Sequence, residues 1–523
     1  MAWSAEFVDV LMSGSSAAFC WAIEVLTVGS VPSAGAYIIA SAPGVGDVQC
    51  IGLRGVQVQG QRLSPASWSS TIGAFSVDIV GDPRPVFEHV TRGSWVRVLV
   101  GLGGWAIDRY QPIAIGRVYN ISGAPPKWVI DCWDWQSALR SRNDPANPDL
   151  FYNVIGSTTT ADAFAFTANS TTAFDVVATG AFERETSQPG ALKVTTSGGD
   201  SFYLVYTAVP SSTRFTVSAN DKFASTQVSF TSATPSVDAV DEVAFLAGHP
   251  MNIVRKLLTS TGAGTNGTYD VYPSGWGYAI PSYLVDNEDT DRQRDASVYV
   301  DSGSYTVGIH VDEPQTDGLA WLQSWMQPMG LFLTTRMGLI TVRAYVCPSS
   351  TRTAIPGDPV AVITDDDIQP GSVAWEGWDS EYATEYYLIG FTSVKHNGTP
   401  ITTYGTGAAP VTLPAANTLL IDVSASVYDN TDSVNVHNEL IARLEKSRTR
   451  IPERIRLTVP LRFAQLAPGD GVFLDTTKVY GRQDDGNAYD GRYAVVVEVS
   501  PNWTGGECVV GLALFPTSED AWV

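Results

Sequence analysis

Apolar and polar residues alternate along much of the chain. In the N-terminal region the alternation is clearest at residues 55–59, 75–80, 95–100 and 112–119, and a glycine-rich stretch separates the last two segments. Because successive side chains of a strand point to opposite faces, a period of two predicts strands with one buried face. We therefore expect residues 1–148 to form a β-barrel or a small sandwich.

The composition changes after this region. Residues 149–246 are rich in serine and threonine, and runs such as 201–206 and 214–218 alternate again. A segment of different composition that can bury a face of its own is typical of a separate domain. We predict an inserted β-sandwich here.

Helical spacing begins at Pro250. Residues 250–258 place their apolar side chains on one stripe. A second helix is expected after Thr316, with apolar residues three and four positions apart as far as Met329. Both helices need an apolar surface to pack against.

A hairpin is predicted directly after the second helix. Residues 331–343 form two apolar runs around Met337 and Gly338, and the second helix is expected to pack on them. Together with the two helices, this hairpin predicts an α+β module over residues 247–358.

The last part of the chain, residues 359–523, returns to strand patterns. Residues 454–459 alternate, and residues 492–499 and 508–515 indicate a closing hairpin. One helix is expected at 434–446. The fold class that follows is mainly β with an α+β part: two β-barrel-like domains, the α+β module and the inserted sandwich.

Composition and charge limit the functions that the chain can have. Its 523 residues, 44% of them hydrophobic, are enough for several domains, and a charged fraction of 16% with 47 glycines and 30 prolines favours strands and turns. The net charge of −22 disfavours stable binding to DNA or to anionic membranes. The sequence contains neither a signal-peptide pattern nor an apolar run long enough for a membrane span, so we expect assembly in a cytoplasm.

The cysteines and histidines form no recognisable site. No cysteine pair has the spacing of a zinc site or of a disulfide framework, which predicts buried free thiols. No two histidines have a metal-binding helical spacing, and an ordinary surface or turn position is favoured for each. These residues are Cys20, Cys50, Cys132, Cys347, Cys508, His89, His249, His310, His396 and His437.

Two other motifs favour structural interpretations. Residues 262–267 match a GxGxxG pattern, but they follow a predicted helix instead of a strand, so a flexible turn is favoured over a nucleotide loop. The acidic runs at 286–291, 365–367 and 484–487 lack the spacing of a calcium loop, and solvated loops are favoured.

Aromatic residues are abundant, with 15 Trp, 21 Tyr and 19 Phe. Tryptophans cluster at Trp128, Trp133 and Trp135, and again at Trp375 and Trp378. An exposed cluster could bind sugars, but packing in cores and at domain interfaces is favoured, since aromatic residues dominate both. The sequence thus predicts no catalytic residue, no cofactor and no metal ligand.

Three segments of the last third follow one another in a known order. Residues 438–444 have a helical pattern, residues 455–461 a strand pattern, and residues 466–474 place Pro468, Gly469 and Asp470 before the next strand. Pro468 presets a turn, Gly469 permits a positive φ, and the Asp470 side chain can accept a hydrogen bond from the backbone nearby.

This order resembles the hub proteins of long-tailed, siphophage-like bacteriophages and of gene transfer agents. Upstream segments agree in order. Residues 95–119 and 128–132 are similar to the first hub domain, and residues 252–258 and 319–342 are similar to the middle one. The resemblance spans most of the chain apart from the serine- and threonine-rich insert.

The resemblance implies a structural virion protein and not an enzyme. It implies a homotrimeric baseplate hub at the tail tip, whose two barrels per chain would match a hexameric tail tube. The implied partners are a distal tail protein ring, the tape-measure protein, and central tail fibre or tip proteins, and the protein would act in host attachment and DNA ejection. DNA would pass through without stable binding along an acidic channel, and this chain would not insert into a membrane.

Two alternatives remain open. The chain could be a distal tail ring protein with an inserted carbohydrate-binding domain, which would be hexameric. It could also be a glycan-degrading tail enzyme, with aromatic subsites and a catalytic carboxylate pair whose separation only the fold defines.

Overall fold

The structure is a computed structural model of the chain. The residues that it describes are 3–12, 19–26, 37–49, 53–58, 60–64, 69–140, 156–162, 164–167, 171, 173–178, 190–217, 230–232, 238–259, 262–265, 271–274, 277–278, 280–289, 307–311, 317–344, 360–378, 388–395, 399–404, 418–422, 426–428, 453–479, 492–503 and 505–514. Strands dominate, as the alternation predicts.

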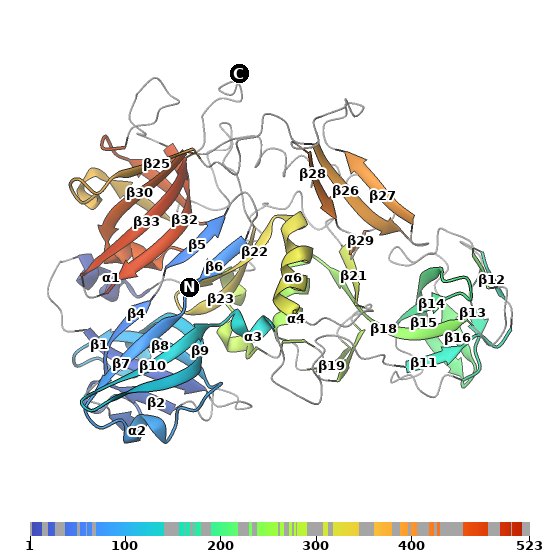
Figure 1. Cartoon of the computed structure of the whole chain (residues 1–523), viewed down its shortest axis with the longest axis horizontal. Coiled ribbons are helices and arrows are strands. Elements are labelled where there is room, and N and C mark those ends of the chain that lie inside the picture. Colours follow the sequence, from blue (N-terminus) through green and yellow to red (C-terminus); the bar gives the residue numbers. More distant parts are fainter. Residues whose placement is uncertain are drawn as a thin grey trace.

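The N-terminal region forms a curled sheet of eight strands (Figure 1). In sheet order these are β3 (Val48–Gln49), β2 (Tyr37–Ala40), β1 (Phe19–Leu26), β8 (Trp95–Leu102), β9 (Gln111–Ala124), β10 (Lys127–Asp134), β7 (Phe75–Val80) and β4 (Leu53–Val58). The short helices of this region are α1 (Ala5–Met12), α2 (Arg84–Phe87), η1 (Ile107–Arg109) and α3 (Ser137–Arg140). The alternation in β7 buries Phe75, Val77 and Ile79 in one core. The strands predicted at the N-terminus are therefore confirmed.

The C-terminal region forms a second curled sheet. Its main path is β24 (Ala361–Thr364), β31 (Gly471–Asp475), β32 (Arg492–Asn502), β33 (Glu507–Leu514), β30 (Glu453–Pro460) and β25 (Ala374–Trp378). Its 3-10 helices are η5 (Asp365–Asp367) and η8 (Leu461–Gln465). The predicted closing hairpin is confirmed as β32 and β33, which pair antiparallel from Ala494↔Leu514 to Asn502↔Glu507.

Two strands from the N-terminal region belong to this second sheet. β5 (Gln61–Ser64) and β6 (Ser69–Ile72) pair with each other, and β5 pairs with β32 through Arg62↔Glu498 and Gln61↔Val499. In Figure 1 these blue strands lie against the red C-terminal sheet. A division of the chain at residue 148 does not anticipate this exchange.

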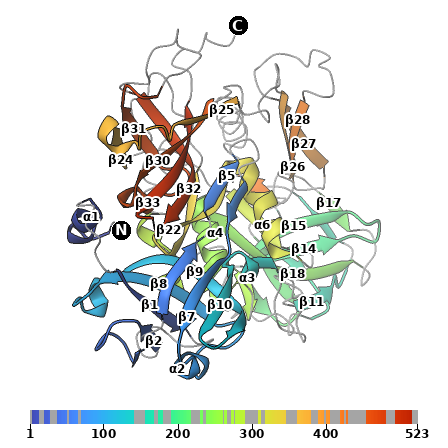
Figure 2. The same cartoon turned by 60° about the vertical axis from the view of Figure 1, so that its left-hand side comes forward.

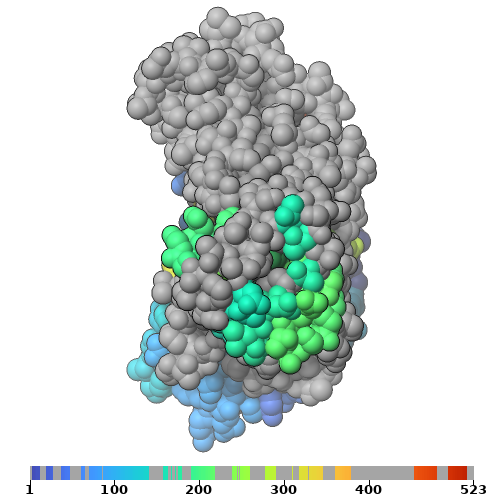
Figure 3. Space-filling view, turned by 90° about the vertical axis from the view of Figure 1, so that its right-hand side faces the viewer, coloured from blue at the N-terminus to red at the C-terminus, as the bar shows by residue number. Residues whose placement is uncertain are grey.

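The inserted region lies at one end of the molecule, at the right of Figure 1 and toward the viewer in Figure 3. Its strands are β11 (Gly156–Thr159), β12 (Phe164–Phe166), β13 (Ala173–Asp175), β14 (Gly190–Thr195), β15 (Ser201–Ser211), β16 (Arg214–Val217), β17 (Phe230–Ser232) and β18 (Ala239–Gly248). β12 and β17 pair as a ribbon, and the other six share one ten-stranded sheet. The first half of β18 pairs with β11 and β14, and its second half pairs with β20 (Val271–Ser274) and β21 (Val307–Val311). β18 therefore connects the insert to the middle of the chain.

The middle of the chain packs against both curled sheets, and Figure 2 shows it from a second side. Its elements are α4 (Pro250–Thr259), β19 (Gly262–Thr265), η3 (Ser282–Leu284), α6 (Gly318–Met326), η4 (Gln327–Met329), β22 (Leu331–Arg336) and β23 (Leu339–Ala344). The Asp317 side chain caps α6 by accepting a hydrogen bond from the Ala320 N–H, and Gly330 follows η4 in the left-handed region. Both predicted helices and the predicted hairpin are confirmed. Their core joins residues from both sheets, including Trp95 and Val497.

Three further strands form a separate sheet in the order β27 (Thr399–Tyr404), β26 (Leu388–Lys395) and β28 (Thr418–Asp422), and β29 (Ser426–Tyr428) pairs with β21. The helix predicted at 434–446 lies outside the described residues, as does the segment 438–444 of the family resemblance. Of the helices that are described, none combines the length and the apolar character that a membrane crossing needs.

Candidate functional site

The hairpin β22–β23 lies at the junction of the two curled sheets. Every residue in both strands is buried. Its turn is formed by Met337 (φ 47°) and Gly338 (φ 67°), the two positive φ values of a tight hairpin turn. A Cβ on Gly338 would lie 3.0 Å from Pro112 of β9, so glycine is required both by the turn and by the close packing against the N-terminal sheet.

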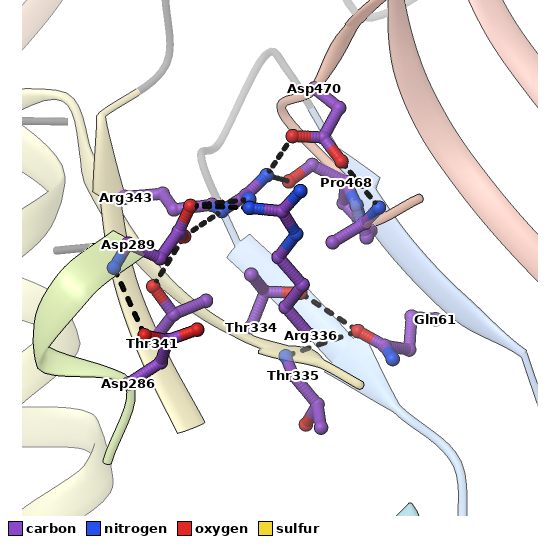
Figure 4. Close-up of polar contacts among 11 residues, drawn as sticks. Gln61, Asp286, Asp289, Thr334, Thr335, Arg336, Thr341, Arg343, Pro468 and Asp470 are labelled. Carbon is purple, nitrogen blue, oxygen red and sulfur yellow. Dashed lines mark hydrogen bonds and ion pairs between the residues drawn. The ribbon is translucent and has the colours of Figure 1, made fainter. Parts of the chain in front are cut away.

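Arg343 of β23 is the centre of a buried ionic cluster. Its Nε donates to Asp289 Oδ2 at 2.9 Å and its Nη1 donates to Asp470 Oδ1 at 2.8 Å (Figure 4). The side chains of all three residues have 0% exposure. Arg343 Nη1 also donates to the Pro468 carbonyl at 3.2 Å. One guanidinium therefore connects the middle module to the C-terminal sheet.

Asp289 accepts further hydrogen bonds besides those from Arg343. Arg336 Nη1 donates to its Oδ1 at 2.8 Å, and Thr341 Oγ1 donates to its Oδ2 at 2.8 Å. Its own backbone N–H donates to Asp286 Oδ1 at 3.0 Å. A buried carboxylate needs such compensation, since burial without partners costs several kcal/mol per charge.

The electrostatics of Arg343 have two opposed causes. Burial alone lowers the pKa of its guanidinium. The attraction of Asp289, and then of Asp470, together outweighs burial, so the pKa of Arg343 is raised above its usual value. Arg343 therefore stays charged, and a charged arginine with five donors can bridge two carboxylates at once.

The turn at Pro468 and Gly469 has the structure that the sequence predicts. Gly469 has a φ of +87°, and Asp470 Oδ2 accepts a hydrogen bond from the Ala467 backbone N–H at 2.8 Å. A Cβ on Gly469 would lie 2.6 Å from Phe332 Cζ. The motif thus does more than turn the chain, because its aspartate presents the other carboxylate oxygen to Arg343.

The exchanged strands add neutral hydrogen bonds to the same junction. Gln61 Oε1 accepts from Thr334 Oγ1 at 2.8 Å and from the Thr335 backbone N–H at 3.1 Å (Figure 4). Ser70 donates to the Leu333 carbonyl, and Trp135 Nε1 donates to Thr335 Oγ1 at 2.8 Å. The hairpin β22–β23 is therefore bonded to residues from the beginning, the middle and the end of the chain.

The chemistry of this cluster is that of a structural connection. The carboxylates of Asp289 and Asp470 are both engaged by Arg343 and are closed off from solvent. Within the described residues there is no group of three or more His, Cys, Asp or Glu side chains arranged to hold a metal ion. The cluster holds elements in place, and it offers no accessible acid, base or nucleophile.

Sequence reasoning found Asp470 through its turn but missed Arg343 and Asp289. The available signal was the position of Arg336 and Arg343 inside strands whose other residues are almost all apolar or threonine. A charged residue in a fully buried strand requires a charged partner, although the pattern does not say where in the chain that partner lies.

Two acidic runs differ from the solvated loops that we expected. Asp286 and Asp289 are 3% and 1% exposed, because they belong to the Arg343 cluster. In the second run, Asp367 is 6% exposed and pairs with Arg462, and Asp365 accepts hydrogen bonds from Thr476 and Thr477. The run at 484–487 lies outside the described residues.

The prediction of a flexible turn at 262–267 was also wrong in part. Gly262–Thr265 is strand β19, which pairs antiparallel with β20, so its alternating glycines lie in a ladder. No helix starts within this strand. A nucleotide loop would need a strand, a turn and a helix in succession.

Two of the described cysteines agree with the prediction of buried free thiols. Cys132 and Cys508 are buried and Cys20 is half-buried, all three unbridged. Burial raises the pKa of the Cys508 thiol to about 12, and burial likewise raises the pKa of Cys132. The thiols of Cys132 and Cys508 therefore stay protonated near neutral pH. Cys50 and Cys347 lie outside the described residues.

The two described histidine side chains are not arranged to bind a metal ion. His89 stacks on Tyr37 with ring centroids 3.7 Å apart, and His249 Nδ1 accepts from the Met251 backbone N–H at the start of α4. The side chains of His310, His396 and His437 lie outside the described residues.

The tryptophan clusters divide between core and surface. Trp135 is fully buried, and Trp128 packs edge-on against Phe87, as core packing predicts. Trp133 instead is 44% exposed, and Trp375 is 36% exposed. The side chain of Trp378 is outside the described part of the chain.

Comparisons with known proteins add little to this geometry. No protein-family profile matches the chain, and no curated relative is found. Among solved structures, the chain is similar to a chain of the virion of a native gene transfer agent particle, with 11% sequence identity and a TM-score of 0.19, over 45% of this chain and 84% of the other. A likeness of this size establishes neither fold nor role, so the functional argument rests on the junction itself.

Proposed function

We propose that this chain is a structural virion protein, the trimeric baseplate hub at the tip of a phage-like tail, and that it is not an enzyme. The observation that carries the proposal is the Arg343 cluster, which ties the middle hairpin to the turn of the C-terminal sheet with all three charged side chains at 0% exposure. The residues of that turn, from Pro468 to Asp470, are also among those that resemble known hub proteins.

A fixed relation between two curled sheets is what a symmetry adaptor needs. If each chain presents two similar sheets at a constant angle, three chains present six, and a threefold ring can match a sixfold tube. The connection between the two sheets must therefore be rigid, so that the chains of the ring keep the same geometry at every interface. The β5–β6 exchange and the Arg343 cluster both supply rigidity, because neither sheet can rotate without breaking buried polar contacts.

The charge of the chain fits a passage for DNA. Its net charge of −22 would keep DNA from adhering to a channel lined by its acidic side chains, since cationic contacts to phosphate are what hold nucleic acid to protein. Under this proposal the neighbours are a distal tail ring above, the tape-measure protein within, and fibre or tip proteins below.

Native mass spectrometry of the purified full-length chain tests the proposal. We expect a trimer, alone or after mixing with the ring protein of the same particle. A stable hexamer would instead favour the distal tail ring, and glycan hydrolysis abolished by one carboxylate substitution would favour the enzyme. Electron microscopy of the particle should show this chain in threefold density at the tail end.

A further inference from the structure

An exposed tryptophan and a half-buried tyrosine stack on each other on the N-terminal sheet. Trp133 of β10 is 44% exposed, and its ring stacks on Tyr119 of β9 with centroids 5.0 Å apart and an interplanar angle of 10°. Tyr119 covers one face of the indole. The accessible area of Trp133 therefore lies on its second face and its edges.

A β-bulge places Tyr119 beside Trp133. The register between β9 and β10 passes from Asn120↔Asp131 directly to Val118↔Cys132, so Tyr119 is the extra residue of β9. A bulge redirects a side chain that a regular ladder would point elsewhere, and bulges are frequent next to functional sites. The stacked pair is thus a product of the local backbone and not of a flexible loop.

Neighbouring side chains hold the platform in position. Trp133 is the cross-strand partner of Arg117, whose Nε donates to the Gly93 carbonyl and whose guanidinium lies over the Trp95 ring. The next residue of β10, Asp134, accepts the Ser137 backbone N–H at the start of α3. The indole therefore stands on a rigid sheet, which lowers the entropy lost when a ligand binds.

Polar groups, and not further apolar ones, surround the pair. Asp131 precedes Trp133 on the same face of β10, and the exposed Asn120 donates to Asp131 Oδ2 at 3.5 Å. In the described residues, the large hydrophobic side chains that are exposed are spread over different strands and loops: Tyr37, Trp133, Val177, Val362 and Trp375. Of these, Trp133 is the one on this face. A stable protein interface buries about 800 Å² of surface per partner, and its centre is more apolar than the surroundings of this pair.

We propose that Trp133 and Tyr119 form a binding site for neutral carbohydrate. The electron-rich face of the indole attracts the weakly positive C–H groups on one face of a sugar ring. Asn120 and Asp131 supply the adjacent donor and acceptors that sugar hydroxyls need, in the pattern of a few placed polar groups beside an aromatic surface. The net charge of −22 opposes anionic ligands, including nucleic-acid bases carried on phosphate.

This inference does not depend on the hub proposal. A carbohydrate site on the first sheet would serve any surface-exposed particle protein. A trimeric hub without sugar binding, or sugar binding by a protein that is not a hub, would separate the two conclusions.

Saturation-transfer NMR on the full-length protein tests the site. The probes are methyl glucoside, methyl galactoside and N-acetylglucosamine, with glucuronic acid as the charged comparison. We expect at least one neutral sugar to receive saturation, and Trp133→Ala to weaken its binding by about tenfold or more, as loss of one stacking partner does. Trp133→Phe should retain part of the binding because a ring remains.

Trp375→Ala is the matched control, since Trp375 is a similarly exposed indole on the other curled sheet. It should leave sugar binding unchanged. Trp133→Ala should keep the thermal unfolding temperature of the parent, whereas Trp375→Ala also removes the indole N–H that donates to the buried Glu453 and should lower that temperature. The proposal is overturned if no neutral sugar receives saturation, or if Trp375→Ala lowers binding as much as Trp133→Ala. It is also overturned if Trp133→Ala changes the oligomeric state, because the face is then an interface between proteins.

Discussion

Two arginines in this molecule each bridge two carboxylates, in opposite surroundings. Arg343 joins Asp289 and Asp470 at the junction, and all three side chains are closed to solvent. Arg456 of β30 joins Glu376 and Glu498 at 2.9 and 2.7 Å, but its side chain is 37% exposed and those of its partners are 31% and 18% exposed. The geometry of the two clusters is similar, and their burial is not.

Burial decides what each cluster contributes. Water screens the exposed cluster, and the removal of one member leaves groups that water can solvate. At the junction, removal of Arg343 would leave two buried carboxylates without their main partner, and the desolvation of those charges is no longer offset. The buried cluster is therefore a requirement of the fold, whereas the exposed one is an accessory.

The largest expected effect comes from Arg343→Met, which has a similar length and no charge. We expect a loss of about 3–5 kcal/mol in the free energy of unfolding, because Asp289 and Asp470 remain buried. Arg456→Met is the control and should lose less than about 1 kcal/mol. Urea unfolding of both variants measures the difference, and equal losses would break the comparison.

A second pair of variants separates backbone strain from close packing. Gly469 and Gly371 both have a positive φ, +87° and +75°, but a Cβ would meet Phe332 at 2.6 Å in the first and nothing within 4 Å in the second. We expect Gly371→Ala to lower the free energy of unfolding by about 1–2 kcal/mol and Gly469→Ala by about 2–4 kcal/mol.

The same unfolding measurements decide this prediction. A Gly469→Ala variant no less stable than Gly371→Ala would mean that the junction can yield to an added methyl group. The turn and the hairpin would then not be held rigidly together.

The smallest effect is expected at Asp365, which is accessible to water. Hydrogen bonds from Thr476, then from Thr477, lower the pKa of Asp365 from 3.8 to about 2. Because the pKa is lower in the folded state, its stabilisation is present above pH 3.8 and is lost as the pH falls toward 2. The urea midpoint of Asp365→Asn should lie slightly below that of the parent at pH 6, and the gap should narrow at lower pH. A gap that widens on acidification would show that the sign is wrong.

Much of the fold follows from local patterns. The strands of β7, β8 and β9, the helices α4 and α6 and the turn at Met337 and Gly338 all appear where spacing predicts them, because each depends on neighbours within a few residues. The turn at Gly469 belongs to the same class. These features need no information about the rest of the chain.

The junction could not be read in the same way. Arg343 meets Asp289 and Asp470 across separations of 54 and 127 residues, and Gln61 meets Thr334 across 273. A periodicity gives the buried face of a strand, but it does not state which strand lies beside it. The stacking of Tyr119 on Trp133 was equally hidden, because it depends on the bulge at Tyr119 that breaks the alternation of β9.

The exchange of β5 and β6 between sheets also sets an order of events during synthesis. Arg62 leaves the ribosome 436 residues before its partner Glu498 in β32. The hairpin of β5 and β6 must wait for this long intervening stretch to be made, since domains otherwise fold in order as they emerge. A chain terminated prematurely would thus keep an unpaired strand edge, which invites aggregation, and would be recognisable as unfinished.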